Sequence, residues 1–385
     1  MQLISMKIGI DAGPAFRLSK TGVGNYTYHL INHLLKNAPN DEYVLWYQVP
    51  LLTKYSIPEI FLDQPNVRVI KSRLPDRFFL LWARYCSKFS FIDSMVNVDV
   101  FHATSVWGFP LRMAGKRVIT VHDVTFLTTP DSYTKGELNL IKIFTRSVQN
   151  ADLVIADSSN TKKDLVELLM VPEDKIRVIL LGVDDSFHPI DDGDLIHSIR
   201  EKYRLENDYI LHVGTLQPRK NLVRLIEAFH QIQQNGSIDC QLVLAGGKGW
   251  MYDEIFQKVS VLGLESKVVF TDYISEEDLL VLMNGAAVFT LVSLYEGFGL
   301  PPLEAMACGT PVIVSNISSL PEVVGDAGIL VNPYDVDEIA RAIHEVLVNE
   351  RLREEMRVKG LERAKQFSWE KTAKETLKAY EEVLW

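Results

Sequence analysis

The stretch LYEGFGLPPLEAMACGTPVIVS contains two glutamates, Glu296 and Glu304, separated by seven residues. An apolar run with the length and β-branched content of a buried strand precedes it, and two prolines after its glycine-rich loop suit the start of a helix. The pattern predicts Glu296 at the carboxyl end of a strand and Glu304 in the first turn of the next helix. Both carboxylates would then face one crevice beside free backbone N–H groups, where a phosphate-bearing ligand with hydroxyls can bind. Taken alone, Glu304 also has a structural interpretation, because an acid in a first helical turn stabilises the helix dipole.

A cationic pair lies in the segment HVGTLQPRKNLVRLIEAF, where Gly214 follows a predicted strand and Arg219 and Lys220 open the next predicted helix. Cations at a helix N-terminus oppose the helix dipole, so their position there calls for an anion. A phosphate group would satisfy both side chains and the free N–H groups of the helix. The alternative is that both side chains are ordinary solvated surface residues.

Other candidate residues follow predicted strands or begin predicted helices. Gly22 and Gly24 lie in KTGVGNY, which is incomplete as a dinucleotide fingerprint because that motif needs glycine in place of Thr27. The glycines still suit a tight turn that places N–H groups in a cleft, or an ordinary strand-to-helix turn. His122, in VITVHDVTF, could hydrogen-bond a ligand at a strand end, although lone histidines are more often structural.

Three further residues, Lys248, Tyr273 and His102, are weaker candidates. Lys248, in GGKG, could approach a phosphate or a base, or lie in a solvated loop, and Tyr273 follows another predicted strand. His102 ends the strand before that of His122, and His212 is expected to pack against its own domain.

Short apolar strands alternate with helical patterns along the chain, which is typical of parallel α/β sheets. A polar, turn-forming stretch at residues 188–193 interrupts the alternation, so we place a first domain over residues 1–188 and a second over residues 189–366. Residues 367–385 form a separate amphipathic helix. The predicted strands are 7–11, 42–47, 67–70, 100–102, 117–121, 153–156 and 176–179, then 209–213, 241–245, 267–270, 288–292, 311–315 and 328–331. The predicted helices are 24–37, 78–89, 136–150 and 159–168, then 222–234, 251–262, 275–284, 320–324, 336–349 and 351–366.

Composition limits the classes of function. The 385 residues are enough for two domains with full cores, and the net charge of −10 argues against nucleic acid as the main partner. The cysteines, Cys86, Cys240 and Cys308, are odd in number and far apart, which fits a reducing cytoplasm and gives no metal-ligand spacing. No apolar run has the length of a membrane span, and the first residues lack the layout of a secretion signal.

The paired glutamates, followed by a small-residue helix and Gly309-Thr310-Pro311-Val312, resemble the retaining glycosyltransferases of the GT-B fold, in particular family four, which includes bacterial mannosyl- and glucosyltransferases. The resemblance extends over nearly the whole chain and is strongest over residues 209–331. It implies an α/β architecture of two Rossmann-like domains facing a central cleft. The first domain would bind the acceptor, the second would bind the nucleotide sugar, and the helix at residues 367–385 would cross back to the first.

The resemblance also implies roles for individual residues. Glu296 would orient the donor sugar, Glu304 would grip both ribose hydroxyls, Arg219 and Lys220 would bind the diphosphate, and His122 would contact the donor sugar. The catalytic set is then Glu296, His122, Arg219 and Lys220. The donor-binding set is Gly22, Gly24, Gly214, Arg219, Lys220, Lys248, Tyr273, Glu296, Gly297, Phe298, Gly299, Leu300 and Glu304. The family's mechanism is debated, but retention is thought to use the leaving phosphate as the base.

The expected enzyme is a retaining hexosyltransferase that uses a nucleotide diphosphate sugar, with mannose from GDP-mannose as the first choice, in polysaccharide or lipopolysaccharide synthesis. A UDP-glucose-dependent glucosyltransferase and a UDP-sugar epimerase of the same fold are the alternatives. The acceptor would be a saccharide or a lipid-linked saccharide. Asp335-Val336-Asp337 imitates a metal motif, but it lies at a predicted helix start and fits an N-cap, so we expect no metal and no cofactor.

The segment at residues 71–91 mixes basic and aromatic residues. It could touch a membrane surface or a lipid-linked acceptor, or form a helix that packs its aromatic side inward. We therefore expect a cytoplasmic protein, with peripheral contact at the inner face of the membrane left open.

Overall fold

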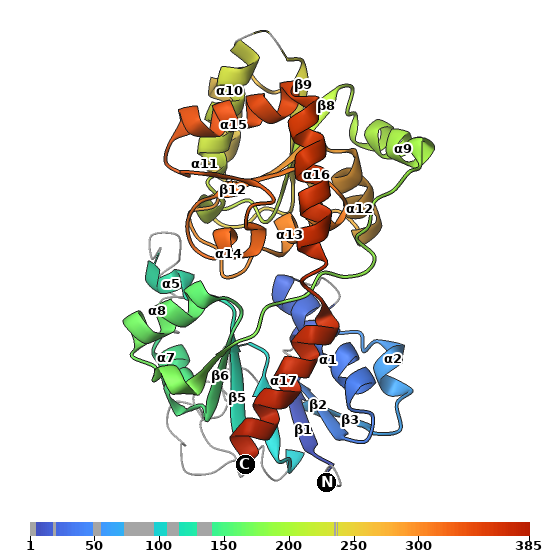
Figure 1. The fold of residues 1–385 in the computed structure, drawn as a ribbon, viewed down its shortest axis with the longest axis vertical. Helices are drawn as coiled ribbons and strands as arrows, with labels where there is room; N and C mark the ends of the chain where they lie inside the picture. The colour runs from blue at the N-terminus through green and yellow to red at the C-terminus, as the bar shows by residue number, and fades with distance from the viewer. Residues whose placement is uncertain are drawn as a thin grey trace. The chain divides into compact units, whose positions relative to one another are not determined.

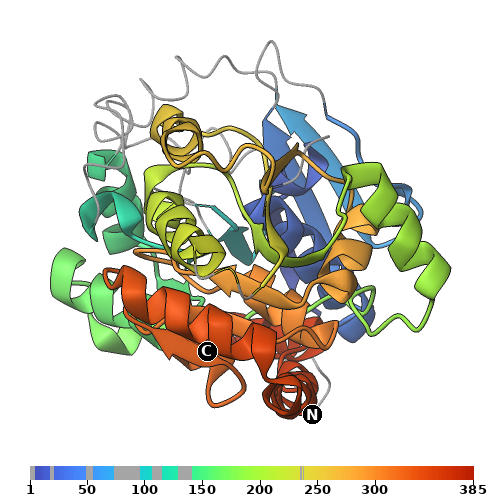
Figure 2. The ribbon, with the colours of Figure 1, turned by 90° about the horizontal axis from the view of Figure 1, so that it is seen from above.

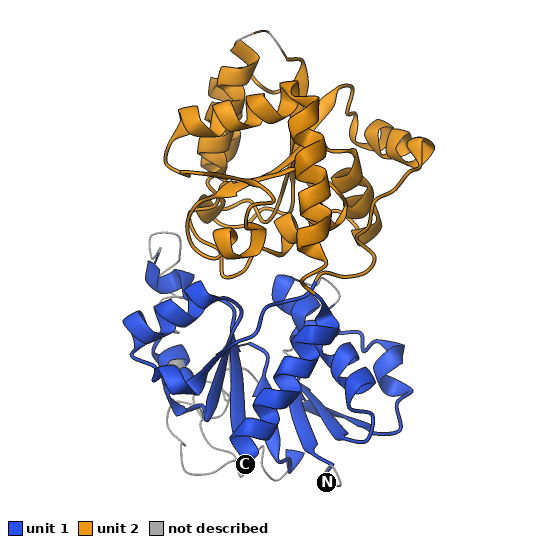
Figure 3. Ribbon diagram, in the orientation of Figure 1, with its two compact units in different colours: residues 1–182, 368–385 blue, residues 183–367 orange. Residues whose placement is uncertain are grey.

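The computed structural model describes residues 5–17, 21–48, 55–72, 96–105, 115–128, 141–234, 236 and 238–385, and it divides the chain into two compact units (Figures 1 and 3). Unit 1 comprises Met1–Gly182 and Ser368–Trp385, and unit 2 comprises Val183–Phe367. The segment at residues 183–188, which the sequence assigned to the first domain, thus belongs to unit 2. The two points where the chain changes unit are adjacent, because the Val183 N–H donates to the Phe367 carbonyl at 3.3 Å.

In its described residues, unit 1 contains a parallel sheet of seven strands in the order β3-β2-β1-β4-β5-β6-β7. The central strands are buried and rich in β-branched residues, as strands covered on both faces require. The strand order reverses at the neighbouring pair β1 and β4, where open α/β sheets bind ligands. The strands are β1 (Lys7–Asp11), β2 (Glu42–Gln48), β3 (Val67–Ser72), β4 (Val100–Ala103), β5 (Lys116–Val121), β6 (Leu153–Ala156) and β7 (Ile176–Val178).

The helix α17 packs along α1 and crosses the sheet of unit 1 (Figure 1). The Trp369 ring stacks on His29 with ring centroids 5.1 Å apart, and the Tyr380 hydroxyl lies 2.6 Å from Nδ1 of the buried His102. These contacts explain why residues 368–385, which follow unit 2 in the sequence, belong to unit 1. The helices of the unit are α1 (Gly22–Asn37), α2 (Glu59–Leu62), α5 (Thr125–Thr128), α7 (Ile141–Asn150), α8 (Ser159–Leu169) and α17 (Trp369–Leu384), with 3-10 turns at Pro14–Phe16 and Glu173–Lys175.

Unit 2 contains a parallel sheet of six strands among its described residues, in the order β10-β9-β8-β11-β12-β13. Its order reverses at the neighbouring pair β8 and β11. The strands are β8 (Asp208–Val213), β9 (Cys240–Ala245), β10 (Val268–Asp272), β11 (Val288–Leu291), β12 (Val312–Ser315) and β13 (Ile329–Val331).

Among the helices of unit 2, α10 packs against α11 and α15, α9 packs against α12, and α13 packs against α16. In Figure 2 the yellow-green α10 and the red-orange α15 lie together, and the green α9 lies at the other side of the unit. The helices are α9 (Gly193–Tyr203), α10 (Leu222–Gln234), α11 (Asp253–Val261), α12 (Glu276–Gly285), α13 (Leu300–Ala307), α14 (Leu320–Val324), α15 (Val336–Val348) and α16 (Glu350–Ala364), with a 3-10 turn, η4, at Pro218–Lys220.

Most predicted strands and helices agree with the structure to within one or two residues at each end, with three differences that bear on function. Helix α9 was missed, because it begins at Gly193, the last residue of the polar stretch taken as a linker. Helix α1 begins at Gly22, so Gly22 and Gly24 form a first helical turn and not the tight turn that was predicted. The predicted helix at residues 78–89, and nearly all of the membrane-contact candidate at residues 71–91, lie outside the described residues.

None of the helices among the described residues is both long enough and apolar enough to span a membrane. Asp335 is an N-cap, as predicted, and its side chain accepts a hydrogen bond from the Glu338 N–H at 2.9 Å.

Candidate active site

Two loops meet at the point in unit 2 where the strand order reverses. One follows β8 and ends in the turn η4, which carries Arg219 and Lys220, and the other follows β11 and carries Glu296. Because β8 and β11 are neighbouring parallel strands, both loops leave the same edge of the sheet. The Leu294 N–H donates to the Arg219 carbonyl at 2.9 Å, which joins the loops through their backbones.

Arg219, Lys220 and Glu296 form a buried charged triad. Arg219 donates to Oε2 of Glu296 at 2.8 Å, and Lys220 donates to Oε1 at 2.6 Å. The side chains are only 13%, 9% and 11% exposed, in that order. Burial disfavours a charged carboxylate, but the positive charges of Arg219 and Lys220 outweigh this effect and lower the pKa of Glu296 to about 2. The triad therefore carries one net positive charge at neutral pH.

The sequence predicted that both cations bind an anion, with a phosphate as the expected one. In the structure both are paired with the carboxylate of Glu296. This ion pairing was missed, because Glu296 lies more than seventy positions from its partners in the chain. The cations also lie in the turn before α10 and not in its first turn. Gly214 makes room for this arrangement, since a Cβ there would lie 3.1 Å from Cε of Lys220.

Serine and glycine residues hold the loop of Glu296 in place. The Glu296 N–H donates to Oγ of Ser318 at 3.1 Å, and the Ser319 hydroxyl bonds the carbonyls of Glu296 and Phe298 at 2.9 and 2.7 Å. Phe298 is buried, and its ring packs edge-on against Phe367. Gly299 has φ of +119°, and a Cβ there would lie 2.8 Å from Cδ2 of Leu320. The chain therefore needs glycine to enter α13 at this point.

Glu304 lies in the second turn of α13, not in the first as predicted, because the helix begins at Leu300. Burial, reinforced by the negative charges of Glu276 and Asp184, raises the pKa of Glu304 to about 8. Its side chain has no hydrogen bond or ion pair with any described residue. A helical dipole role would place the acid in the first turn, so the observed position favours an interaction with a ligand.

Among the described residues of the predicted site, Lys248 and Tyr273 do not contact the triad. Lys248 lies over the rings of Tyr252 and Phe256, 5.4 and 5.1 Å from their centroids. Tyr273 follows β10 and is 66% exposed. Neither makes a hydrogen bond or ion pair with the triad in the described part of the chain, so their roles stay predictions.

The predicted residues of unit 1 lie at the edge of its sheet. Gly22 begins α1, and Gly24 is buried within the same first turn. His122 follows β5, and its two ring nitrogens contact Asp157 and the Thr104 carbonyl at 2.6 and 2.9 Å. Asp157, which follows β6 in the sequence ADSSN, was not among the predicted residues.

Two family comparisons cover most of the chain. Residues 20–187 match the family described as Glycosyltransferase Family 4, and residues 196–363 match Glycosyl transferases group 1. The O-antigen chain mannosyltransferase B of Escherichia coli is 35% identical over 283 residues, which are 73% of this chain and 74% of that protein. This chain belongs to the family-four glycosyltransferases.

This chain is also similar to longer proteins and to solved structures. A serotype-specific mannosyltransferase WbdA of Escherichia coli is 33% identical over 266 residues, which cover 67% of this chain but only 32% of that protein. Sucrose-phosphate synthase from Thermosynechococcus elongatus superposes with a TM-score of 0.78 at 23% identity, covering 98% of this chain and 99% of that one. Anabaena HepE, solved in complex with UDP and glucose, superposes with a TM-score of 0.72 at 18% identity, covering 97% and 98%. These structural likenesses establish the GT-B fold.

Two buried acceptors near the triad of this glycosyltransferase have no hydrogen-bond partner among the described residues: Nε2 of His212 and Oε1 of Gln217. His212 bonds the Thr290 carbonyl through Nδ1, so Nε2 carries a bare lone pair. A Cβ on Gly214 would lie 3.4 Å from both this atom and Nζ of Lys220, which places the lone pair beside the cation. Buried polar atoms are rarely left without partners, so a ligand or water is expected to complete this part of the site.

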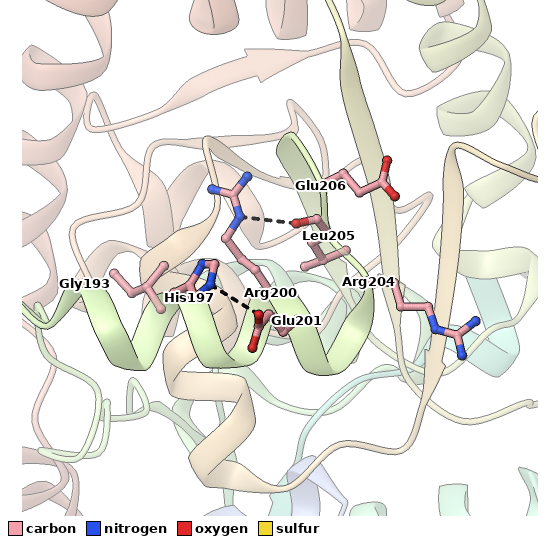
Figure 4. Close-up of a pocket in the computed structure, with 8 residues that line it drawn as sticks. Gly193, His197, Arg200, Glu201, Arg204, Leu205 and Glu206 are labelled. Atoms are coloured by element: carbon pink, nitrogen blue, oxygen red, sulfur yellow. Dashed lines mark hydrogen bonds and ion pairs between the residues drawn. The ribbon is translucent and has the colours of Figure 1, made fainter.

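A cavity of about 600 Å³ lies along α9, and none of the predicted site residues lines it. Figure 4 shows its lining, in which His197 pairs with Glu201 and Arg200 bonds the Leu205 carbonyl. The described residues contain no group of three or more histidine, cysteine, aspartate or glutamate side chains placed to hold a metal ion.

Proposed function

We propose that this protein is a retaining mannosyltransferase, which moves mannose from GDP-mannose to a saccharide or lipid-linked saccharide acceptor in the synthesis of a bacterial surface polysaccharide. The mannosyltransferases among its relatives support the sugar, and the O-antigen relative supports the pathway class. The complex of HepE with UDP and glucose supports a nucleotide sugar as donor. We propose no metal and no cofactor for the reaction.

The observation that carries the proposal is the buried triad of Arg219, Lys220 and Glu296 where the strand order of unit 2 reverses. Departure of a diphosphate leaves negative charge on oxygen as the anomeric carbon becomes positive. Arg219 and Lys220 are held in place by Glu296, and the triad keeps one net positive charge. It can therefore stabilise the leaving group without the cost of rearranging water. The three charged side chains are only about a tenth exposed. Burying charges costs free energy that apolar side chains would not, which favours a functional role for the triad over a packing role.

Glu296 connects these cations to the sugar. Each of its carboxylate oxygens already accepts one hydrogen bond from a cation. An ionised carboxylate has about four lone-pair positions, so each oxygen can accept a second hydrogen bond from a sugar hydroxyl. In this role Glu296 fixes the position of the sugar and of the two cations together, and it is not used as a nucleophile or a base.

The remaining donor contacts follow from α13. The N–H of Leu300 at its uncapped start is available to a phosphate or sugar oxygen, since no side chain of the described residues caps this helix. Glu304, one turn further along, accepts hydrogen bonds from the two ribose hydroxyls. Tyr273 and Lys248 lie in loops after β10 and β9, at the carboxyl edge of the sheet, where a nucleotide base would be held.

The test is a transfer assay with radiolabelled GDP-mannose or UDP-glucose and a panel of mannose-terminated saccharide acceptors, with and without EDTA. We expect transfer from GDP-mannose, unaffected by EDTA, and an axial glycosidic bond in the product by NMR. Transfer from UDP-glucose alone would replace the sugar assignment, and an equatorial product would refute retention. Conversion of a UDP-sugar without acceptor would favour the epimerase alternative.

Variants locate the reaction in the proposed site. Glu296→Ala should abolish transfer while the far-ultraviolet circular dichroism stays unchanged. Glu227→Ala is the matched control, because Glu227 also pairs with a lysine of unit 2, Lys258, but with both side chains about 30% exposed. Near-normal turnover of Glu296→Ala would show that the site is assigned wrongly.

A further inference from the structure

His122 has hydrogen-bond acceptors at both of its ring nitrogens. Nδ1 lies 2.6 Å from Oδ2 of Asp157, and Nε2 lies 2.9 Å from the Thr104 carbonyl. The three residues follow β5, β6 and β4, which are neighbours in the sheet, so all three lie at its carboxyl edge. Ligands of open α/β sheets bind at this edge.

The count of protons in this arrangement is fixed by chemistry. A backbone carbonyl cannot donate, so Nε2 must carry a hydrogen. The short Nδ1–Oδ2 contact needs a second hydrogen between the ring and the carboxyl. The pair therefore holds one proton more than a neutral histidine beside an ionised aspartate.

The surroundings of Asp157 make that extra proton necessary. The residue is 1% exposed, and its other oxygen, Oδ1, has no hydrogen-bond partner among the described residues. A buried carboxylate with a single hydrogen bond is strongly destabilised unless a positive charge faces it. Within the described part of unit 1, the His122 ring is the group that meets this need.

The other polar groups around His122 do not compete for the proton. Asp123, next in the chain, accepts hydrogen bonds from Thr125 through its own carboxyl, and its negative charge favours a protonated ring. Tyr26 packs edge-on against the ring at 4.8 Å, and its pKa is raised well above the ordinary value by burial, so it stays neutral. His102 is fully buried and neutral, because burial lowers its pKa to about 3.

From this geometry we infer that Asp157 is a positioning residue for sugar transfer: it keeps the His122 ring protonated and in one orientation, so that His122 acts as a fixed cation and not as a general base. A base needs a free lone pair, and neither nitrogen has one while Asp157 and Thr104 hold the ring. Burial opposes the charged ring, but Asp157 outweighs burial and raises the pKa of His122. The role in transfer rests on the proposed function, whereas the protonation of the ring does not.

The first test uses the unaltered protein. Histidine labelled with ¹⁵N, with the His122 signals identified by their loss in His122→Gln, reports whether each ring nitrogen carries a hydrogen. We expect both nitrogens of His122 to be protonated at about pH 7 to 8, where an ordinary histidine has mostly lost its second proton. A bare Nδ1 at pH 7 would overturn the inference without reference to any enzyme activity.

The second test uses Asp157→Asn, which keeps the size and hydrogen-bonding capacity of the side chain but removes its charge. Losing an adjacent opposite charge lowers a pKa by roughly 1–3 units, so the variant ring should be neutral at pH 8 and regain its proton on acidification. We expect transfer by the variant to be at least about tenfold below wild type at pH 8. This ratio should recover by about tenfold per pH unit as the ring becomes protonated.

Asp152→Asn is the matched control. Asp152 pairs with Arg117 across the same two strands, β5 and β6, but at their amino ends. Its ratio to wild type should not change with pH. A deficit of Asp157→Asn that is equal at every pH, or no deficit, would overturn the inference. If Asp157→Asn does not fold, the NMR result decides. If wild type transfers no sugar from any donor, the proposed function fails, and the NMR result still decides whether Asp157 holds the proton.

Discussion

Glu296→Gln separates the charge of Glu296 from its shape, and its effect on stability can be worked out from the structure. The substitution keeps the volume and a hydrogen-bond acceptor, but it leaves Arg219 and Lys220 without a buried carboxylate. We expect unit 2 to become less stable at neutral pH, although Glu296 belongs to the proposed binding site. Removing one partner of a buried ion pair is more costly than the pair itself is worth.

The expected magnitude follows from the pKa of Glu296, which falls from 4.5 to about 2 in the folded protein. Each unit corresponds to about 1.36 kcal/mol, so the ionised form contributes about 3 kcal/mol to the free energy of unfolding. Because the pKa is lowered on folding, this contribution is fully present above pH 4.5 and is lost as the pH falls towards 2. At pH 7 the loss corresponds to a drop of roughly 6–12 °C in the melting temperature of a domain of this size.

The assay is differential scanning calorimetry of wild type and Glu296→Gln at several pH values between 7 and 3. Hydrogen-exchange mass spectrometry of peptides from Val183–Phe367 assigns the transition to unit 2. Glu227→Gln is the control, since its ion pair with Lys258 is about 30% exposed and should contribute less than about 1 kcal/mol. The difference between wild type and Glu296→Gln should narrow as the pH falls below 4.5.

Two results would refute this reasoning. One is a loss of stability in Glu296→Gln no larger than in Glu227→Gln, and the other is a loss that stays constant down to pH 3. Ligand binding gives an independent check. GDP should raise the melting temperature of Glu296→Gln more than that of wild type. In the variant the diphosphate supplies the missing negative charge beside Arg219 and Lys220, and it is not repelled by a carboxylate at position 296.

Three further predictions concern stability. Because the pKa of Glu304 is raised to about 8, the folded protein holds a proton that the unfolded chain loses near pH 4.5, so stability falls as the pH rises from 4.5 to 8. Glu304→Gln should abolish this slope in calorimetric scans at pH 5 and 9, and an unchanged slope would show that Glu304 ionises freely. Gly299→Ala should cost about 1–3 kcal/mol in thermal unfolding because of its φ of +119°, whereas Gly193→Ala, in open space, should cost nothing. Tyr380→Phe should cost about 1–3 kcal/mol by leaving a buried nitrogen of His102 without its partner, and a change below 0.5 kcal/mol, about the size of a surface effect, would argue against that hydrogen bond.

The fold followed from the sequence because short apolar strands alternate with amphipathic helices, and such local patterns determine a parallel sheet almost completely. Helix α9 was missed because it begins at Gly193, the last residue of the polar stretch at residues 188–193, directly after the N-cap Asp192. The sequence predicted a short helix after the loop of Glu296, as observed in α13, but it did not predict that this helix begins at Leu300. Proline is tolerated at any position of a first helical turn, so Pro301 and Pro302 could not fix the residue at which the helix begins, and Glu304 fell just beyond its first turn.

The candidate site was predictable only in part, for a reason that Glu296 and Asp157 share. Motifs identify single residues along one segment, whereas both of these residues act through partners on a neighbouring strand. Arg219 and Glu296 were each found by their own motif, but their contact depends on β8 lying beside β11. Asp157 had no motif at all, and the available signal was an acid at a strand end next to the strand of His122.

The adjacent crossings at Val183 and Phe367 make unit 2 an insertion within unit 1, and this determines the order in which the two can fold on the ribosome. Residues 183–367 are all synthesised before α17, so unit 2 can fold while unit 1 still lacks the helix that covers α1. At about 5–20 residues per second, residues 1–182 wait roughly ten to forty seconds for Tyr380 to reach His102. During that interval the buried imidazole and the rings that Trp369 later covers are accessible, so nascent unit 1 is a natural binding site for chaperones.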